Sequence, residues 1–415
     1  MPRQADLELA RRDPAIRSMQ SLFTPTDLVT ELAPHWGATG AELRYLRYKP
    51  GASLLATVAV RRGAEERLVQ AVAFGAGAAD KLEKIARAGA KDDVGLGAVI
   101  DLGRQVAVAD ASADRALPGV VGFLRSAEGT TRPLVYKPGR RWVARHTAAD
   151  GERQVVRVHR PSDAATLVER HRAVAATGLP VPAMKSPHLR VGIITLAWVP
   201  GTALDRVGAD LDHDALRTEA GRLLAGLHHG NVPAGLPGAR RGDDLRAAVT
   251  AVGHVMPELA DDAHRIAERI LAALAGRRQT VLVHGDFSAD QVIVRPDLAG
   301  ACDHTADTEG DQGQAPVTIL DLDRVRSDDP MADLASWYAA QVVTAPSTPA
   351  GDPEEVLAAL LAGYRAAGGT VDTAALRWHA AAALLQRAVE PFRYHQDWPD
   401  RVAAIITAAD QMGRG

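Results

Sequence analysis

Two stretches near the start of the chain show the same alternation of apolar and polar residues. Residues 42–74 alternate in three runs that are separated by a Lys-Pro-Gly break and by Gly63, a pattern typical of three strands joined by tight turns. Residues 132–160 repeat the order of strand, Tyr-Lys-Pro-Gly, strand, glycine turn and strand. We therefore predict a duplicated β-rich unit, with independent use of a common hairpin turn as the alternative.

Each copy is followed by a stretch that predicts a helix. Residues 78–89 give the first helix, and residues 161–178 give the second, with Ser162 as a candidate N-cap and Gly178 as its end. Before the first copy, Thr26 is a candidate N-cap for another helix whose apolar residues share one face.

The chain after Gly201 is predicted to be mainly helical, because apolar residues recur there at helical spacing. The predicted helices lie in residues 218–230, 260–276, 353–369 and 377–398. Two short apolar runs, residues 280–284 and 317–323, predict strands.

An acidic, glycine-containing insert at residues 299–316 separates these two strands. Its composition predicts a mobile loop. His304 with Asp303 and Asp307 offers metal-binding residue types, but we do not favour a metal site there. Cys302 is the one cysteine of the chain, which excludes a disulfide within it and fits a reducing compartment. We therefore expect a cytoplasmic protein.

The composition is that of an ordinary globular protein, with 47% hydrophobic and 24% charged residues among 415. A formal net charge of −3 argues against a nucleic-acid partner or an anionic membrane surface. No apolar run reaches the roughly 20 residues that a membrane span needs. The sequence leaves open whether the protein is a monomer or a homodimer.

These patterns divide the chain into four predicted segments. They are a helical segment at residues 1–41, a cap or repeat at 42–125, a β-rich lobe with its hinge at 126–200, and a helical lobe at 201–415.

The residues with the clearest chemical potential surround the two short strands after residue 280. His284-Gly285-Asp286 is followed five residues later by Gln291, and the second strand ends in Asp321 and Asp323. Phosphoryl transfer needs a carboxylate to orient or deprotonate the attacking hydroxyl and oxygen ligands for magnesium. Carboxylate and amide oxygens are suitable ligands for that cation.

The order of three motifs resembles the aminoglycoside phosphotransferase and choline kinase superfamily. These motifs are His-Gly-Asp at 284–286, Leu-Asp-Leu-Asp at 320–323, and Asp-Pro-x-x-Asp-Leu-Ala at 329–335. The resemblance extends from about residue 132 to the end. It implies an α+β, bilobal protein-kinase-like fold with a β-rich N-lobe and a mainly helical C-lobe, preceded here by an extra β-rich unit that resembles a duplicated N-lobe.

The resemblance also implies roles for individual residues. It makes Asp286 the catalytic base, His284 an orienting residue of the loop, Gln291 and Asp321 magnesium ligands, Asp323 a possible helper, and Asp333 a brace for the loop. The family usually has Asn where this chain has Gln291, but a glutamine keeps the amide oxygen. The ending Gln-Val-Ile is similar to the loop of maltokinases, which favours a sugar acceptor.

The nucleotide site departs further from the family pattern. The third strand usually carries a Lys, and the aligned residue is Arg157, opposite Ala71 in the first copy; Arg keeps the charge but not the geometry. A glycine-rich phosphate loop is missing from the sequence. Glu169 is a further candidate for the nucleotide site, and a solvated surface role explains it equally well. Lys137, Arg140 and Arg141 at the hairpin turn could contact the phosphates, and they fit a solvated tip as well. Adenine would meet the backbone at Ala197 to Val199.

The acceptor is expected against the C-terminal helices. Planar polar groups and one aromatic residue suit a sugar, and the candidates are Gln386, Arg387, Glu390, Arg393 and Trp398. The sequence thus favours an ATP- and magnesium-dependent phosphotransferase that acts on a hydroxyl of a sugar, amino sugar or aminoglycoside-like small molecule. The alternative is a pseudokinase-like protein that binds a nucleotide or acts as a scaffold.

Overall fold

A computed structural model describes residues 2–277, 280–295, 316–345 and 350–414. The chain forms two compact units. Unit 1 comprises Met1–Ala165, Ala183–Trp198 and Pro391–Pro399, and unit 2 comprises Thr166–Pro182, Val199–Glu390 and Asp400–Gly415. The predicted loop at 299–316, except Pro316, lies outside the described residues, as do Cys302, Asp303, His304 and Asp307. The predicted four-segment division stays a prediction.

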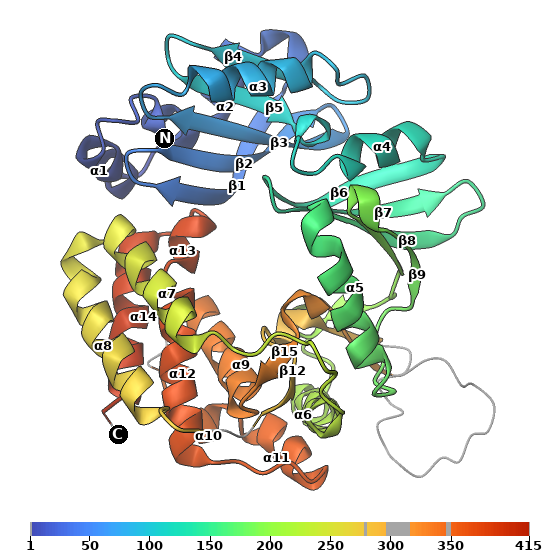
Figure 1. The fold of residues 1–415 in the computed structure, drawn as a ribbon, viewed down its shortest axis with the longest axis vertical. Helices are drawn as coiled ribbons and strands as arrows, with labels where there is room; N and C mark the ends of the chain where they lie inside the picture. Colours follow the sequence, from blue (N-terminus) through green and yellow to red (C-terminus); the bar gives the residue numbers. More distant parts are fainter. Residues whose placement is uncertain (1, 278–279, 296–315, 346–349, 415) are drawn as a thin grey trace. The chain divides into compact units, whose positions relative to one another are not determined.

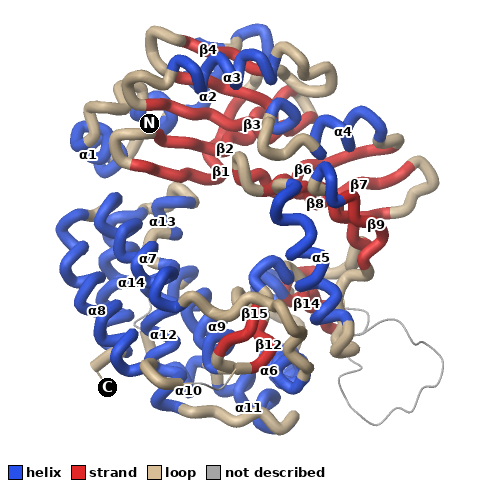
Figure 2. Tube along the Cα trace, viewed as in Figure 1, coloured by secondary structure: helices blue, strands red, loops and turns tan. Residues whose placement is uncertain are grey.

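Unit 1 contains two antiparallel sheets with the same strand order (Figures 1 and 2). The elements of the first are β1 (Gly40–Lys49), β2 (Ser53–Arg62), β3 (Glu65–Phe74), α3 (Ala79–Gly89), β4 (Ala98–Asp101) and β5 (Val106–Asp110). Those of the second are β6 (Gly129–Lys137), β7 (Arg141–Ala148), β8 (Arg153–His159), β9 (Met184–His188) and β10 (Ile193–Ala197). Helix α5 (Pro161–Ala175) follows β8 and has residues in both units. The orders β1-β2-β3-β5-β4 and β6-β7-β8-β10-β9 confirm the predicted duplication.

The two copies also share their first turn. Each first strand carries a register shift, and each Lys-Pro-Gly turn places its glycine at positive φ, +66° for Gly51 and +65° for Gly139. One carboxylate outside each sheet holds the turn. Asp13 accepts hydrogen bonds from the hydroxyl of Tyr48 at 2.8 Å and from the N–H of Gly51 at 2.7 Å. Asp114 accepts the same two bonds in the second copy, at 3.0 and 2.6 Å.

The pairing register corrects the alignment of the third strands. Leu54 pairs with Tyr48 and with Ala73, while Trp142 pairs with Tyr136 and with Val158. The residue that corresponds to Arg157 is therefore Val72, one position beyond the expected Ala71. The cause is that β2 and β3 have 10 residues each whereas β7 and β8 have 8 and 7, so that alignment by motif loses the register along this hairpin.

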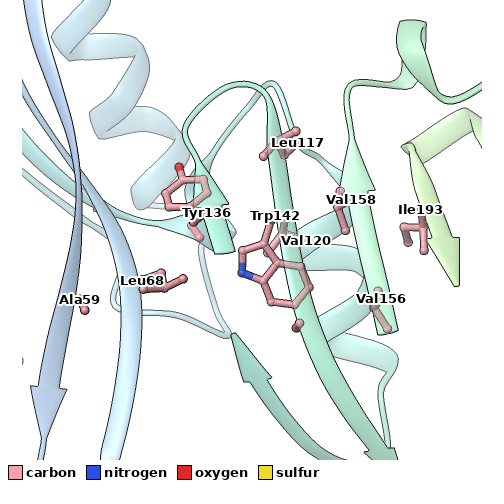
Figure 3. Close-up of a cluster of buried hydrophobic side chains, with 11 residues drawn as sticks. Ala59, Leu68, Leu117, Val120, Tyr136, Trp142, Val156, Val158 and Ile193 are labelled. Atoms are coloured by element: carbon pink, nitrogen blue, oxygen red, sulfur yellow. The ribbon is translucent and has the colours of Figure 1, made fainter. Parts of the chain in front are cut away.

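The two sheets share a hydrophobic core within unit 1. Trp142 and Tyr136 are 1% and 2% exposed, and they lie in one cluster with Ala59 and Leu68 of the first sheet (Figure 3). Helix α4 (Gly119–Ser126) contributes Val120 to this cluster. Burying such aromatic rings contributes about 2 kcal/mol or more each. The first copy is therefore packed onto the second as part of one folded unit.

Short helices precede the first sheet: α1 (Gln4–Arg12), a 3-10 helix at Met19–Phe23, α2 (Pro25–Leu32) and a 3-10 turn at Pro34–Trp36. Thr26 was the predicted N-cap of α2, and this is wrong because Thr24 occupies the cap and Pro25 is the first helical residue. Proline suits that position because its missing N–H has no partner there in any case. Ser162 is also not a cap, since α5 begins at Pro161.

Unit 2 is mainly helical, as predicted. Its helices are α6 (His213–His229), α7 (Arg241–Val255), α8 (Ala260–Ala273), α9 (Met331–Thr344), α10 (Pro353–Val356), α11 (Ala358–Ala366) and α12 (Thr373–Arg387); α13 (Glu390–Arg393) and α14 (Trp398–Met412) follow, and each has residues in both units. Its short strands are β11 (Thr202–Ala203), β12 (Val281–Val283), β13 (Val292–Val294), β14 (Val317–Ile319) and β15 (Arg326–Asp328). In the described residues, no helix is both long and apolar enough to cross a membrane.

Candidate active site

The loop that follows β12 carries the predicted base and is held by buried side chains. His284 is fully buried, and its Nε2 lies 2.7 Å from the carbonyl oxygen of Leu320. Its Nδ1 accepts a hydrogen bond from the N–H of Asp286 at 3.3 Å, so the proton is on Nε2, which donates to Leu320. Gly285 has φ +81°, and a Cβ there would lie 2.4 Å from the carbonyl oxygen of Arg324. The loop therefore requires a glycine at this position.

Asp333 in α9 fixes the backbone of the same loop. Its carboxylate accepts hydrogen bonds from the N–H groups of His284 and Gly285, both at 2.7 Å. His228 in α6 lies 3.1 Å from the same carboxylate and 2.8 Å from the hydroxyl of Tyr364. Burial alone would raise the pKa of Asp333, but its hydrogen bond with His228 and the nearby charges lower it overall. The sequence analysis missed His228, because nothing local separates it from any other helical histidine.

Asp286 lies between two guanidinium groups. Its Oδ1 is 2.5 Å from Nη2 of Arg387, and its Oδ2 is 3.6 Å from Nε of Arg324. Burial would raise the pKa of Asp286, but the charges of Arg387 and then Arg324 outweigh burial, so the pKa is below its ordinary value. The side chain is thus an anion at neutral pH, with one oxygen held by Arg387.

Arg387 was predicted to contact the acceptor, and in this structure it contacts Asp286, the predicted base. Besides Asp286, its guanidinium donates to the carboxylate of Glu390 at 3.3 Å and to the hydroxyl of Ser336 at 3.2 Å. Its side chain is only 16% exposed. Burial would lower the pKa of Arg387, but the carboxylates of Asp286 and Glu390 raise it overall. The cation is therefore a fixed part of this site.

The two predicted magnesium ligands lie at the ends of neighbouring strands. β13 pairs with β14, and the N–H of Leu320 donates to the carbonyl oxygen of Gln291 at 2.8 Å. Asp321 follows Leu320 directly, so Gln291 and Asp321 are brought together by the strand pairing. The amide nitrogen of Gln291 donates to Asp290 at 2.7 Å, which leaves the amide oxygen directed away from that carboxylate. Asp321 has φ +54°, a strained conformation that Asp tolerates better than most residues.

Two protein oxygens suit a magnesium ion that is also bound by its substrate, and they do not make a site whose ligands all come from the protein. Magnesium is commonly held by one or two protein oxygens together with the phosphates of its substrate. No group of three or more His, Cys, Asp or Glu side chains that could hold a metal is found in the described part of the chain. The donors present at Gln291 and Asp321 thus fit a magnesium ion that is bound with a nucleotide.

The surroundings of the residues that flank this pair do not test their predicted roles, which stay predictions. Asp323 is half-buried, and its carbonyl oxygen accepts a hydrogen bond from Arg170 in α5. Glu169, the predicted acidic partner for the nucleotide site, is exposed on the same helix. Arg170, which the sequence analysis did not single out, is the residue of this helix that contacts the loop after β14.

The predicted nucleotide residues of unit 1 lie on the second sheet. Arg157 is half-buried in the middle of the sheet, paired with Val143 of β7 and Ile194 of β10. At the β6–β7 turn, Lys137 is half-buried and Arg140 is exposed. Ala197 is the last residue of β10, and unit 2 resumes at Val199, close to the Gly201 expected to begin the second lobe. Their roles toward a nucleotide stay predictions.

The remaining acceptor candidates do not all lie in one unit. Gln386 is exposed near the end of α12, and Glu390 is half-buried beside Arg387, both in unit 2. Arg393 and Trp398 belong to unit 1. Trp398 is 2% exposed, and its indole N–H donates to Asp6 at 3.1 Å. Because this ring is used in packing, its placement does not favour the predicted contact with a sugar.

Comparison with known proteins places this geometry in a family. Residues 139–379, more than half of the chain, match the model of the phosphotransferase enzyme family. No curated protein sequence matched this chain.

Several solved structures are similar to it. An aminoglycoside phosphotransferase from Streptomyces rimosus is 22% identical, with 65% of this chain and 98% of that chain covered and a TM-score of 0.46. A choline/ethanolamine kinase family protein from Mesorhizobium loti is 14% identical, with 71% and 91% covered and a TM-score of 0.47. An amicoumacin kinase is 12% identical, with 73% and 94% covered and a TM-score of 0.49.

The family match covers the second sheet from its first turn, the catalytic loop and most of the helical part. The predicted α+β protein-kinase-like fold with an extra N-terminal β-rich unit is thereby confirmed, while the maltokinase-like detail of the loop stays a prediction. The chain belongs to the phosphotransferase enzyme family.

Proposed function

We propose that this enzyme transfers the γ-phosphate of ATP to a hydroxyl of a sugar, amino sugar or aminoglycoside-like acceptor, with Asp286 as the base. The observation that carries the proposal is the loop of Asp286, which Asp333 braces close to Asp321 and to Gln291, whose carbonyl oxygen accepts from the N–H of Leu320 beside Asp321. Family membership favours this enzyme over the pseudokinase-like alternative.

Asp286 suits phosphoryl transfer although its pKa is lowered. A group with a lowered pKa is a weak base, but in a loose transition state the attacking hydroxyl loses its proton late. The main task of the carboxylate is then to accept a hydrogen bond from the hydroxyl and aim its oxygen at phosphorus. Arg387 holds Oδ1 of Asp286, and Oδ2, which lies 3.6 Å from Nε of the exposed Arg324, would accept the hydrogen bond of the acceptor hydroxyl.

The nucleotide would be held by the predicted magnesium ligands and by the predicted phosphate- and adenine-binding residues. Gln291 and Asp321, with Asp323 as a possible helper, would hold Mg²⁺, which neutralises charge on the phosphates. Arg157, Lys137 and Arg140 would contact the phosphates, with Glu169 as a partner, and Ala197 and Val199 would meet the adenine. These roles are proposals that follow from the family resemblance.

The surroundings of Asp286 support an acceptor that carries hydroxyl groups and positive charge. Asp290 and Glu390 both act electrostatically on Arg387, and Asp205 interacts with Asp290. With Asp286, these four carboxylates outnumber the three guanidiniums of Arg387, Arg324 and Arg206, the last of which pairs with Asp205. An amino sugar or aminoglycoside offers hydroxyls for Asp286 and ammonium groups for the remaining carboxylates, so we place these acceptors first.

The decisive experiment measures Mg²⁺-dependent ADP release with a panel of sugars, amino sugars, aminoglycosides and choline-like alcohols. Asp286→Asn keeps the shape of the side chain and removes its charge, and should reduce acceptor-stimulated release by about a thousandfold or more. Asp243→Asn is the matched control, because Asp243 is an exposed aspartate paired with Arg246 on the surface of α7. Full activity of Asp286→Asn would refute the assignment of the base.

A further inference from the structure

One face of the first sheet is directed at the turn of the second. Tyr45 of β1 pairs with Thr57 of β2, so their side chains share a face. The hydroxyl of Thr57 donates to the carbonyl oxygen of Tyr136 at 2.8 Å. The ring of Tyr45 lies 5.4 Å from Nζ of Lys137, a cation–π contact at the β6–β7 turn. These contacts hold the first sheet against the Tyr-Lys-Pro-Gly turn of the second.

Arg47 belongs to the same face, two residues after Tyr45. Its side chain is half-buried, and its guanidinium makes no ion pair or hydrogen bond within residues 2–277, 280–295, 316–345 and 350–414. Burial lowers the pKa of Arg47, and the nearby charges of Arg140 and then Arg160 lower it further. A half-buried guanidinium beside two like charges is in an unfavourable electrostatic environment, which a bound anion would improve.

The carboxylate in the vicinity is already engaged. Asp114 acts on Arg47 only weakly, as the last of the charges that influence it. Its oxygens accept hydrogen bonds from the hydroxyl of Tyr136 and from the N–H groups of Gly139 and Ala116. Asp114 thus holds the turn in shape and leaves the three guanidiniums with an excess of positive charge.

The turn also fixes one of these cations. Nε of Arg160 donates to the carbonyl oxygen of Gly139, so this side chain folds back over the turn. Arg140 is the residue after Gly139 and is exposed to an incoming ligand. The three guanidiniums come from β1, from the β6–β7 turn and from the segment after β8. A solvated basic tip explains Arg140 alone, but it does not explain why the separate first sheet places a half-buried arginine there.

We propose that Arg47, Arg140 and Arg160 form a phosphate-binding site, to which the extra N-terminal unit contributes Arg47. Guanidinium groups bind phosphate oxygens through paired, charge-assisted hydrogen bonds. The assignment of the ligand as ATP rests on the proposed function, whereas a free phosphorylated small molecule would present the same chemistry. The first sheet is then part of a ligand site as well as a packing partner of the second.

The test compares Arg47→Gln with Arg44→Gln. Arg44 is a control on the same strand, an exposed arginine that pairs with Glu42 and Glu66. Calorimetry with inorganic tripolyphosphate measures the site directly, and steady-state kinetics measure the KM for ATP. Arg47→Gln should weaken tripolyphosphate binding about tenfold, since a hydrogen bond to a charged group is lost. Arg44→Gln should bind as the unchanged protein does.

Competition identifies the source of the phosphate. If ATP displaces tripolyphosphate and Arg47→Gln raises the KM for ATP about tenfold, the site serves the nucleotide. If binding of tripolyphosphate weakens while the KM for ATP is unchanged and ATP does not compete, the site serves another phosphorylated molecule.

Two further results keep this proposal separate from the proposed function. Arg47→Lys retains the charge and should recover part of the affinity, which excludes misfolding as the cause of the loss. Equal tripolyphosphate binding by Arg47→Gln, Arg140→Gln and the unchanged protein would overturn the phosphate site even if turnover is normal. Absence of turnover with every acceptor would instead contradict the proposed function, and the calorimetry would still be valid.

Discussion

The two sheets of unit 1 share a backbone and differ in charge. Their strand orders are the same, their first turns have the same glycine conformation, and one carboxylate, Asp13 or Asp114, holds each turn by the same two hydrogen bonds. The carboxylates themselves lie at different distances before their turns in the sequence. The duplication therefore includes tertiary contacts as well as strands.

The cations are found in the second copy alone at three corresponding positions. In the first copy, small or apolar residues occupy these positions. They are the residue after the turn glycine, the residue in the middle of the third strand, and the residue three positions beyond that one. The corresponding pairs are Ala52 and Arg140, Val72 and Arg157, and Gly75 and Arg160. The shared backbone therefore does not fix which side chains it presents. In the proposed function, a few substitutions on one backbone separate a nucleotide-facing copy from a supporting copy.

The largest effect on the KM for ATP should come from a substitution in the third strand of the second sheet. Arg157→Ala should raise the KM for ATP about a hundredfold, because truncating a charged contact costs several kcal/mol. The corresponding change in the first copy, Val72→Ala, should lower the free energy of unfolding by about 2 kcal/mol and leave the KM unchanged, since Val72 is a buried apolar residue. Kinetics and urea denaturation measure the two results. An unchanged KM for Arg157→Ala would show that another cation serves the phosphates.

Much of this fold was predictable because its signals are local. Alternation and the repeated turn motif predicted the first three strands of each sheet. The fourth and fifth strands were missed, since β4 is short and β10 is a continuous apolar run that periodicity alone cannot assign.

The candidate site was predictable only where its residues are close in sequence. Asp286, Gln291 and Asp321 were found by the spacing of their motifs. The pairing of Arg387 with Asp286 joins residues 101 positions apart, and no local pattern reports it. Arg47 was missed for the same reason, because its importance depends on how one sheet packs on the other.

The next largest effect should come from substitutions of the two carboxylates that hold the turns. Asp114→Ala and Asp13→Ala each leave a turn N–H and a tyrosine hydroxyl without their acceptor, so each should lower the free energy of unfolding by about 2 kcal/mol. Asp114→Ala alone should also raise the KM for ATP, by about tenfold, because its turn carries Arg140 and also holds Arg160 through the carbonyl oxygen of Gly139. Denaturation and kinetics on both variants measure this contrast. A similar rise for Asp13→Ala would show that the two turns do not differ in function.

A smaller effect is expected from the exposed cation itself. Arg140→Ala should raise the KM for ATP about threefold, since contacts of exposed charges contribute less than about 1 kcal/mol. The reciprocal change Ala52→Arg places a cation on the first turn and should not alter the KM. Steady-state kinetics at low ionic strength give the best resolution. A lower KM in Ala52→Arg would mean that the first turn also lies within reach of the nucleotide.

The smallest effect is expected from removal of the tyrosine hydroxyl group that each turn has. Tyr136→Phe and Tyr48→Phe each remove one hydrogen bond to a carboxylate and should lower the free energy of unfolding by about 1 kcal/mol, with no change in the KM for ATP. Burial, followed by the charge of the adjacent aspartate, raises the pKa of Tyr136 well above its ordinary value, and burial with the bond to Asp13 raises the pKa of Tyr48.

A raised pKa in the folded state fixes the sign of the pH dependence. The contribution of each tyrosine is complete below the ordinary tyrosine pKa of about 10 and decreases as the pH rises through the higher pKa of the folded protein. The difference in stability between each Phe variant and the unchanged protein should therefore be constant from pH 6 to about pH 9 and shrink above about pH 10. Urea denaturation at stepped pH measures it. If the difference changes below about pH 9 in one variant only, the two turns are not held in the same way, and the comparison between the copies fails at its most conserved contact.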